Sequence, residues 1–308
     1  MQFLINKDVW TKVKVRISYN NRRKHRLGLR ILDCQGSFKH YIGQTLFENN
    51  SNWCPKTLYH LQFPVESIKT AVNFKIVKTK QEYDAVITLR NKAYAQSGKV
   101  DQNSSLVDHL DERSIIIVAK HGPKVVASLR LIISESHQQF EHEQFLILPK
   151  YLPPKKDMME ITRVCTHPDY RAGDLLEGLF QYSALVSVNE DRNWILGSST
   201  DSLLPLYLKL GFQRTPISFE HQDLSGLKHT LFYANKNDIL LGRKVSPLIW
   251  TVFYQDIYLA AVKLGILKKF MISDRMRISI YQICSILVKI LRKYKRYKNM
   301  RKFNLKES

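Results

Sequence analysis

The pattern of apolar and polar residues is most informative between residues 158 and 179. The apolar and β-branched residues from Met159 to Cys165 suit a strand, and the turn signal His167-Pro168-Asp169 ends it. Beyond Gly173, apolar residues recur at helical spacing: Leu175, Leu176, Leu179, Phe180 and Leu185. A strand that feeds a helix through a short turn directs free backbone N–H groups at one point, so we expect an anion site there.

Similar patterns on both sides of this stretch predict further strands and helices. Residues 74–77 suit a strand, residues 80–96 a helix ended by Gly98, and residues 114–120 with 124–134 a hairpin. Residues 194–198 suit a strand, 203–210 a short helix and 229–234 a closing strand. This order predicts a mixed α/β sheet, with residues 99–107 and 136–156 as irregular connections.

The two ends of the chain differ from this core. Residues 1–71 are basic and aromatic, and alternation predicts only one short strand, at 13–17. Residues 247–267 are apolar but interrupted by Gln255, Asp256 and Lys263, which favours an amphipathic helix over a membrane span. We therefore expect a basic N-terminal segment with a small β structure (1–71), a catalytic core (72–237) and a basic helical extension (238–308).

Charge is concentrated in those ends. The net charge is +21. Nine Lys/Arg against Asp8 give +8 for residues 1–30, and thirteen against Asp274 and Glu307 give +11 for 267–308, which leaves 21 − 8 − 11 = +2 between them. Basic residues beside an apolar helix face suit an anionic membrane surface, so we expect peripheral contact through residues 247–306. The alternatives are helices packed on the core with a basic tail, and, less favoured, nucleic-acid binding.

Cysteine usage and the N-terminus concern the compartment. The four cysteines are far apart, which argues against a zinc site or a disulfide framework and fits a reducing compartment. The first ten residues lack the features of a signal peptide. We expect a cytoplasmic protein, with peripheral contact on the inner face of the membrane.

Several motifs, in this order, carry a resemblance to a known family. They are Asp108-His109-Leu110-Asp111, Arg130-Leu131, Glu160-Ile161-Thr162-Arg163, Asp169-Tyr170-Arg171-Ala172-Gly173 and Tyr207-Leu208-Lys209-Leu210-Gly211-Phe212. Across residues 72–235 the chain resembles the GNAT superfamily of N-acyltransferases, and within it most closely the N-acyl-amino-acid synthases and acyl-homoserine-lactone synthases. This resemblance implies an α/β fold with a mixed, mainly antiparallel central sheet flanked by helices.

The resemblance also implies catalytic roles for two residues. Glu160 is the candidate general base for the acceptor amine, and Tyr207 the candidate proton donor to the leaving thiolate. Each has a structural alternative: Glu160 as a carboxylate paired with an arginine, and Tyr207 as a packing residue. In a regular strand Glu160 and Arg163 point to opposite faces, because their separation is odd. A bulge would bring them together and free backbone N–H groups for an oxyanion, and the sequence leaves this open.

Binding roles follow for two further sets of residues. The acceptor's ammonium, or an arginine–carboxylate network, would involve Arg90, Asp108, Asp111, Arg130 and Arg163. The donor's phosphate would lie at Arg171, Ala172 and Gly173. Asp174 and Leu176 stand where acetyl-CoA users usually have glycine or another small residue, and a carboxylate there repels a pyrophosphate. The donor favoured is therefore acyl-ACP with its phosphopantetheine arm, with acyl-CoA second. His109, His121 and His167 lack metal-ligand spacing, and no metal is expected.

These observations lead to one favoured function. We expect an N-acyltransferase that moves a long acyl chain from acyl carrier protein to the amine of an amino acid or related small molecule. The enzymatic alternatives are an acyl-homoserine-lactone-type synthase and a GNAT enzyme that uses acyl-CoA or acetyl-CoA. The alternative from another class is a non-catalytic module that binds membrane lipid or nucleic acid through the basic ends.

Overall fold

A computed structural model describes residues 2–6, 9–21, 26–34, 36–100, 106–135, 137–171, 173–267, 271–284 and 286. The chain divides into two compact units. Residues 1–71 belong to one unit and residues 72–288 to the other.

The first unit has more regular structure than its sequence pattern predicts. Strands β1 (Gln2–Asn6), β2 (Val9–Asn21) and β3 (Arg26–Cys34) form an antiparallel sheet in that order, followed by helices α1 (Gly36–Asn49) and α2 (Pro55–His60). The prediction of a single strand was therefore too sparse. Helix α1 buries Phe38 and Phe47, nine positions apart, and α2 buries Leu58. So few buried apolar positions leave only a weak helical period in the sequence.

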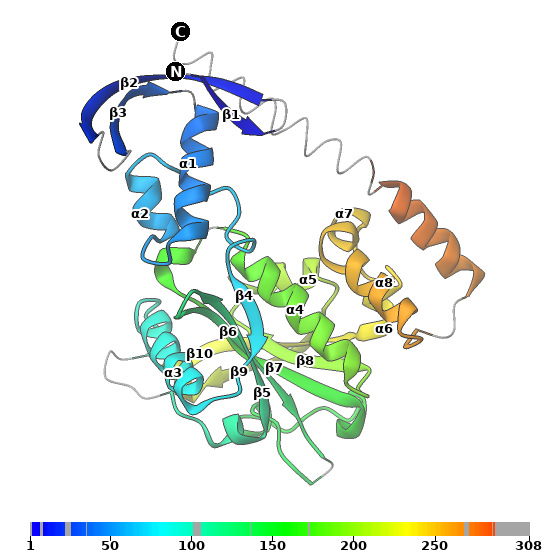
Figure 1. The fold of residues 1–308 in the computed structure, drawn as a ribbon. Helices are drawn as coiled ribbons and strands as arrows, with labels where there is room; N and C mark the ends of the chain where they lie inside the picture. Colours follow the sequence, from blue (N-terminus) through cyan, green and yellow to red (C-terminus); the bar gives the residue numbers. More distant parts are fainter. Residues whose placement is uncertain are drawn as a thin grey trace. The chain divides into compact units, whose positions relative to one another are not determined.

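A seven-stranded sheet forms the centre of the second unit (Figure 1). In spatial order its strands are β4 (Asn73–Ile76), β5 (Ser114–His121), β6 (Lys124–Ile133), β7 (Met158–Thr166), β8 (Trp194–Ser199), β10 (Leu227–Asn235) and β9 (Gln213–His221). All neighbours are antiparallel except β7 and β8, which are parallel. The predicted fold class, a mixed and mainly antiparallel sheet flanked by helices, is confirmed.

Strand β9 was not predicted. It pairs only with β10 at the edge of the sheet, where Pro216 is tolerated because an edge strand has one side free of ladder hydrogen bonds. Pro216 and the charged Arg214 and Glu220 hide the period-two burial of Thr215, Phe219 and His221. Strand β9 contributes to the candidate site, because it ends at His221.

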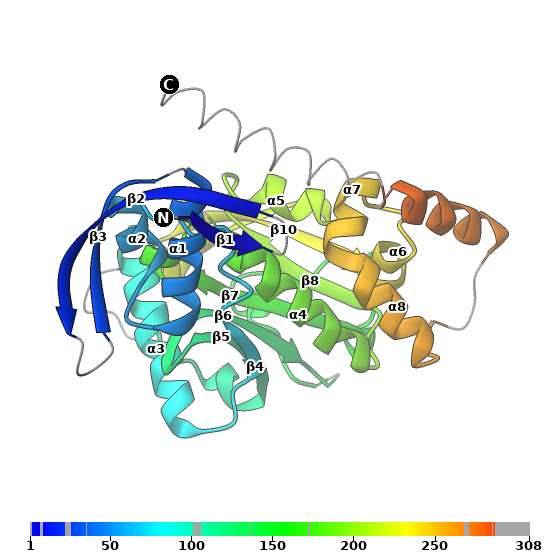
Figure 2. The same cartoon turned by 45° about the horizontal axis from the view of Figure 1, so that its top comes forward.

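Helices cover the sheet on both sides (Figure 2). Helix α3 (Lys80–Ala95) packs Val86, Leu89 and Ala93 against Ile116 and Val118. Helix α4 (Leu175–Asn189) contacts β4, β5 and β6. Leu131 and Ile161 are cross-strand partners, as are Ile116 and Arg130. Because consecutive residues of a strand point to opposite faces, the first pair faces α4 and the second faces α3.

Short helices complete the connections. Four are 3-10 turns: η2 (His109–Arg113), η3 (His142–Gln144), η4 (Lys155–Asp157) and η5 (Pro168–Tyr170). After β8 come α5 (Leu204–Lys209) and, between β9 and β10, η6 (Gln222–Leu224). Residues 136–156 are irregular apart from two such turns, as the sequence predicted, although residue 136 lies outside the described part.

The extension beyond β10 begins with helices that pack on the α4 side. They are α6 (Lys236–Leu240), α7 (Pro247–Ile249), the π-helix η7 (Trp250–Tyr254) and α8 (Gln255–Lys263), and residues 272–284 are also helical. The indole N–H of Trp250 donates to the Leu240 carbonyl at 2.8 Å, and the Tyr254 hydroxyl donates to the Leu210 carbonyl at 2.8 Å. Trp250, Tyr254, Ile257 and Ala261 are buried, whereas Leu248, Leu259 and Val262 are exposed. Within the described residues, no helix has both the length and the apolar character needed to cross a bilayer.

Candidate active site in the split between β7 and β8

The sheet opens between its two parallel strands. Strands β7 and β8 pair only from Met158–Trp194 to Ile161–Gly197, yet both continue beyond the last pair. A cavity of about 60 Å³ is lined by the residues that follow on each strand, Thr162 to Val164 and Ser198 to Thr200. At Gly197 a Cβ atom would lie 2.6 Å from the Phe232 ring and 2.8 Å from Ile161. The glycine therefore lets the strands stay in close contact up to the point where they separate.

A β-bulge lies on the β7 side of this split. The partners Ser128–Cys165 and Arg130–Thr162 are two residues apart on β6 but three apart on β7. Arg163 has φ +51°, in the left-handed region that a non-glycine residue seldom adopts. The bulge that the sequence left open is therefore present. It reorients β7 so that Thr162, Arg163 and Val164 all line the cavity.

Five predicted binding residues form one buried ion cluster beside the cavity. Arg90 bonds Asp111 at 2.7 Å. Arg130 bonds Asp111 and Asp108, each at 2.9 Å, and Arg163 bonds Asp108 at 3.1 Å. The structure thus brings together all five, from α3, η2 and its N-cap, β6 and β7.

The cluster is nearly neutral because a sixth residue completes it. Glu141 lies 2.9 Å from Arg130 and 2.7 Å from Arg163, so three arginines face three carboxylates. Burial raises the pKa of Asp108, but Arg130 and a backbone N–H outweigh it and keep the pKa below its usual value. Buried charges are tolerated only when paired in this way. Asp108 and Asp111 are therefore engaged by arginines and are not available to hold an ammonium on their own.

Glu160 lies behind the cavity. Its side chain is fully buried and is not among the cavity-lining residues. The carboxylate accepts the backbone N–H groups of Glu141 at 2.6 Å and His142 at 3.0 Å, and it contacts His142 Nδ1. Its acceptor capacity is spent on residues 141–142, which places it to position them.

Four residues at the cavity were not singled out from the sequence: Glu141, His142, His221 and His229. His221 ends β9 and His229 lies on β10, with their rings 5.2 Å apart. Burial lowers the pKa of His142 to about 3 and of His229 to about 4, so both are neutral at pH 7. Glu141 is ionised, because Arg163, His221 and Arg130 outweigh burial and hold its pKa well below the usual value. The sequence signal was weak because Glu141 and His142 lie in an irregular segment and His221 ends a strand that was not predicted. His229 lies in the predicted closing strand, but no motif marked it.

Several buried polar atoms at the cavity lack a hydrogen-bond partner among the described residues. They are Arg163 Nε and Nη1, Ser199 Oγ, His221 Nδ1 and His229 Nε2. They come from β7, β8, β9 and β10 and belong to residues that line the same cavity. Buried polar groups are normally satisfied, so this convergence is typical of a site that binds a polar group or water.

Tyr207 also lines this cavity. Its ring stacks on the ring of Phe232, with 4.5 Å between the ring centroids, and it meets the rings of Phe180 and Phe212 edge-on. Burial raises the pKa of its phenol, which therefore keeps its proton at neutral pH. The packing interpretation and the predicted proton-donor role are both compatible with this position.

The predicted donor-binding turn precedes α4. Arg171 Nη2 donates to the Ala93 carbonyl at 3.1 Å and to Ser97 Oγ at 3.2 Å, at the end of α3. Gly173 is exposed and Asp174 is the N-cap residue of α4. Ala172 lies outside the described residues. Lys99 is a second cation near this turn. Burial lowers its pKa, and the charge of nearby Arg171 lowers it further.

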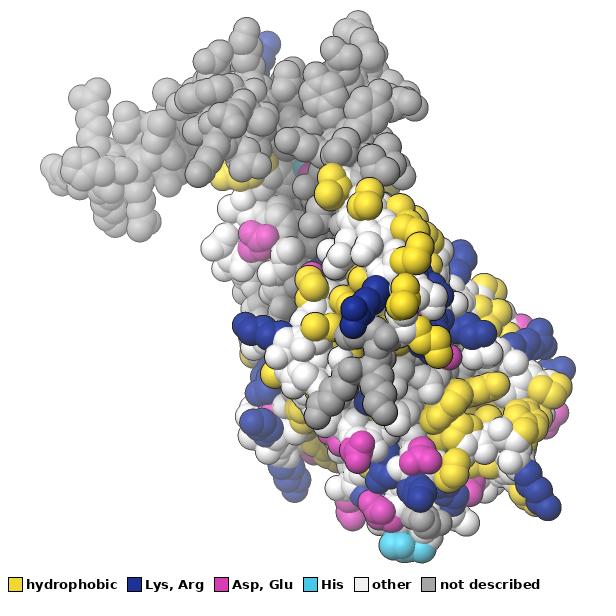
Figure 3. Space-filling view, turned by 90° about the vertical axis from the view of Figure 1, so that its right-hand side faces the viewer, with side chains coloured by type: hydrophobic (Ala, Val, Ile, Leu, Met, Phe, Trp, Pro, Cys, Tyr) yellow, Lys and Arg dark blue, Asp and Glu magenta, His cyan; other side chains and the backbone are white. Residues whose placement is uncertain are grey.

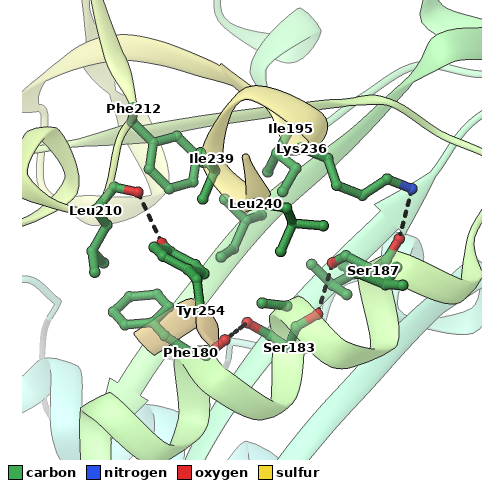
Figure 4. Close-up of a pocket in the computed structure, with 14 residues that line it drawn as sticks. Phe180, Ser183, Ser187, Ile195, Leu210, Phe212, Lys236, Ile239, Leu240 and Tyr254 are labelled. Atoms are coloured by element: carbon green, nitrogen blue, oxygen red, sulfur yellow. Dashed lines mark hydrogen bonds between the residues drawn. The ribbon is translucent and has the colours of Figure 1, made fainter. Parts of the chain in front are cut away.

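An apolar cavity of about 50 Å³ lies under α4 (Figure 4). Small residues on the helix, Ser183, Ala184 and Ser187, leave room for it, and its far wall is made by residues of α6, η7 and the chain after α5: Lys236, Ile239, Leu240, Tyr254, Leu210 and Phe212. Ile161 lines both this cavity and the polar one. The two spaces therefore share a wall at the last paired residue of β7.

An open groove of about 580 Å³ adjoins the polar cavity on the other side. Arg163 lines both spaces. The groove also contains Asp108, His109 and Asp223, and Asp223 Oδ2 lies 3.2 Å from Arg163 Nη2. Arg163 thus stands between the groove and the split. Within the described residues, no cluster of His, Cys, Asp or Glu has the arrangement of a metal site.

Comparison with known proteins agrees with this geometry. The family described as "N-acyl amino acid synthase FeeM" matches residues 85–226, somewhat under half of the chain. This segment contains the ion cluster, the bulged strand, α4 and His221. The predicted resemblance to the GNAT superfamily, in its N-acyl amino acid synthase branch, is confirmed, and the protein is an acyltransferase. The expectation of a non-catalytic module is set aside.

Solved structures with similar folds include FeeM itself, an N-acyl amino acid synthase from uncultured soil microbes, with TM-score 0.46 and 10% identity over 56% of this chain and 94% of that one. The acyl-homoserine-lactone synthase LasI has TM-score 0.42 and 12% identity, covering 57% of this chain and 96% of its own. An acyl-CoA N-acyltransferase from Pseudomonas aeruginosa has TM-score 0.41 and 18% identity, and the match covers 53% of this chain and 99% of that one. No curated protein sequence matches the chain.

Proposed function

We propose that this protein transfers a long acyl chain from a thioester to the amine of an amino acid. The observation that carries the proposal is the junction of three spaces around the split: an apolar cavity, a polar cavity with unpaired groups, and an open groove. Ile161 joins the first two and Arg163 joins the last two. An acyl chain, a reacting carbonyl and an amine acceptor need three such environments side by side.

The groove suits an acceptor that carries both a carboxylate and an ammonium group. Arg163 has two guanidinium nitrogens without a hydrogen-bond partner among the described residues, and these can bind a carboxylate. Asp223 is 47% exposed on its side chain and lies 3.2 Å from Arg163. It can receive an ammonium at the rim. An amino acid presents both groups a few bonds apart, whereas a simple amine would leave Arg163 unused.

The apolar cavity suits the end of an acyl chain. Its walls are aliphatic and aromatic, and its only charged lining group, Lys236, turns its amine to the Ser187 and Glu190 carbonyls at 3.2 and 2.8 Å. The residues of α6 and η7 close the cavity, so the extension after β10 takes part in chain binding. Each buried methylene contributes about 0.8 kcal/mol, which favours long chains over acetyl.

The donor proposed is acyl-ACP. Arg171 is bound to the end of α3, and Asp174 places a carboxylate at the start of α4. This leaves little positive charge for the two phosphates and the 3′-phosphate of CoA, while Lys99 and Arg171 suffice for the single phosphate of a phosphopantetheine arm. In the split, Tyr207 would give its proton to the leaving sulfur, and backbone N–H groups freed by the bulge would hold the carbonyl oxygen.

The proposal is tested with purified protein, hexadecanoyl-ACP or hexadecanoyl-CoA, and an equimolar mixture of the twenty amino acids. Thiol release that depends on the amino acids is expected, with a higher kcat/KM for hexadecanoyl-ACP. Arg163→Met should raise KM for the acceptor, whereas the same change at the exposed Arg214 of the edge strand should not. Equal release with and without amino acids would contradict the proposal.

We also propose that the protein binds the anionic membrane surface through the helix at 272–284 and Ile286 just beyond it. Its outer face is apolar and 55–79% exposed (Figure 3): Ile272, Met276, Ile280, Ile283 and Ile286. Arg275 is exposed on the same helix, and the sequence that follows, outside the described residues, is strongly basic. An apolar helix face with flanking cations is typical of interfacial helices. In the rest of the predicted contact region, 247–267, one face is buried against the core, whereas several apolar residues are exposed: Leu248, Leu259, Val262, Leu264 and Ile266.

Vesicle flotation tests this surface. Wild-type protein should float with vesicles that contain phosphatidylglycerol and less with pure phosphatidylcholine. Ile280→Ser with Ile283→Ser should reduce flotation, and Ile147→Ser, which changes an isoleucine that is 94% exposed elsewhere, should not. Equal flotation of all three proteins would exclude the helix as the membrane contact.

A further inference from the structure

We infer that His221, backed by Glu141, is the general base that deprotonates the acceptor amine, and that Glu160 is a positioning residue. This inference rests on the proposed function, because it assigns a role within amine acylation. A base must present an unshared electron pair to the site. Glu160 does not, since its carboxylate lies outside the cavity lining and accepts two backbone N–H groups.

His221 meets the geometric requirements. Nε2 of its ring lies 3.7 Å from Glu141 Oε1, and this carboxylate favours the tautomer that carries a proton on Nε2. Nδ1 then bears the lone pair, and it has no hydrogen-bond partner among the described residues of the structure. The ring lines the cavity and packs on Phe145 at 4.4 Å, which holds its orientation.

The two neighbouring histidines are less suited to this role. His142 contacts the Glu160 carboxylate through Nδ1, and its pKa of about 3 makes it a very weak base. His229 Nδ1 lies 3.2 Å from Ser198 Oγ, and burial lowers its pKa to about 4. Within the described residues His229 makes no ion pair with a carboxylate, and only the more distant charge of Glu141 acts on it. Its Nε2 is better placed to hold a polar substrate atom. Among the three, only His221 combines a carboxylate on one nitrogen with an unpartnered second nitrogen.

The carboxylate partner is itself held in place by the groups that surround it. Glu141 is fixed by Arg130 and Arg163, and the backbone N–H groups of residues 141 and 142 are fixed by Glu160. Through this series of contacts the buried Glu160 orients residues 141 and 142, and Glu141 in turn orients His221. At 3.7 Å the Glu141 carboxylate acts on the His221 ring through its charge, and a carboxylate beside a histidine stabilises the imidazolium that forms when the ring takes a proton.

The proton and electron balance of the step is simple. His221 Nδ1 takes one proton from the acceptor's ammonium. The freed lone pair attacks the thioester carbonyl carbon, so a C–N bond forms and the carbonyl π electrons move to oxygen. When the intermediate collapses, the C–S bond breaks and its electron pair leaves with sulfur. The sulfur takes a proton from Tyr207, which regains one from the new amide nitrogen, and His221 releases its proton to water.

A pH dependence of this base would reflect all charged and titratable groups around it. They are Tyr94 on α3, Lys99 after α3, Glu141 and His142 from the segment after β6, Arg163 on β7, Tyr207 on α5 and His229 on β10. Glu141 and Arg163 keep their charges at neutral pH and largely offset each other.

The test compares wild-type protein, His221→Gln, His142→Gln and Glu160→Gln in the hexadecanoyl-ACP assay with the amino-acid mixture. His221→Gln should lower kcat with amino-acid acceptors by about 10²–10⁴-fold. An O-alkyl hydroxylamine as acceptor is already neutral at pH 7, so it should restore much of the lost rate for His221→Gln. Glu160→Gln should lower kcat by a smaller factor, and the hydroxylamine should restore its rate as well, because Glu160 acts through His221.

The outcomes separate this inference from the proposed function. If wild-type protein acylates no amine, the proposed function fails. If it does, and His221→Gln keeps the wild-type rate, or the hydroxylamine gives no rescue, the His221 assignment is overturned. For a His221→Gln protein that does not fold, His221→Ala with added imidazole replaces it: recovery of rate with imidazole supports the base, and no recovery overturns it.

Discussion

Ala184→Leu tests whether the apolar cavity under α4 holds the end of the acyl chain. Ala184 is a small residue of α4 that lines this cavity, and the larger side chain would fill part of its roughly 50 Å³. Leucine adds roughly three methylene equivalents, each worth about 0.8 kcal/mol when buried. Displacing the same amount of substrate should cost about 2.4 kcal/mol, or about 50-fold in kcat/KM, for the longest chain that fits the wild type. Chains shorter by about three carbons should be unaffected.

The assay is the kcat/KM of purified protein over a series of saturated acyl-ACPs of increasing length. The chain-length optimum should move down for Ala184→Leu. Ala260→Leu is the matched control, since it makes the same change on the neighbouring helix α8, at a half-buried position that does not line the cavity. If Ala184→Leu keeps the wild-type optimum, or if the control moves it as much, the acyl chain does not end under α4.

Three further changes test the ion cluster, the split and the buried histidines. Arg130→Met leaves three buried carboxylates facing two arginines, so the free energy of unfolding in urea should fall by about 3–5 kcal/mol; a fall below about 1 kcal/mol would contradict the cluster. Gly197→Ala forces a methyl group against the Phe232 ring, which should lower stability by about 1–3 kcal/mol and reduce kcat; unchanged values in both measurements would show that the contact is not tight. His142 and His229 have folded-state pKa values of about 3 and about 4, below the ordinary 6.5. The free energy of unfolding that depends on keeping them neutral is therefore fully present above pH 6.5 and decreases below it, by about 2 kcal/mol for each histidine at pH 5. A urea midpoint that is the same at pH 7 and pH 5 would refute this.

Much of the fold could be predicted because its central elements have clear periods. The hairpin of β5 and β6, helix α3 and the β7–turn–α4 unit all bury one regular set of apolar residues, so their limits fall within a few residues of the prediction. Strand β9 and helix α1 could not be predicted with the same rules. Pro216 interrupts the alternation in β9, and α1 buries too few large side chains to show a helical period.

The candidate site was predictable only in part. Family motifs correctly grouped the arginines and aspartates, and the structure brings those five residues into one cluster. The bulge at Arg163 could not be read from residue types, because a positive φ at arginine has no sequence signal. Glu141 and His221 were missed because both depend on tertiary placement: one follows a long irregular connection, and the other ends the unpredicted strand. The roles assigned to Glu160 and Tyr207 stay predictions until the variants are measured.

The most direct test of N-acyl transfer is mass spectrometry of lipid extracts from bacterial cells that express the protein, with the wild type beside His221→Gln and Glu160→Gln. N-acyl transfer should give a new acylated amino acid with the wild type, whose mass gives the head group and chain length, and a strong decrease with both variants. Folded, well-expressed wild-type protein that yields no new acylated amine would contradict N-acyl transfer.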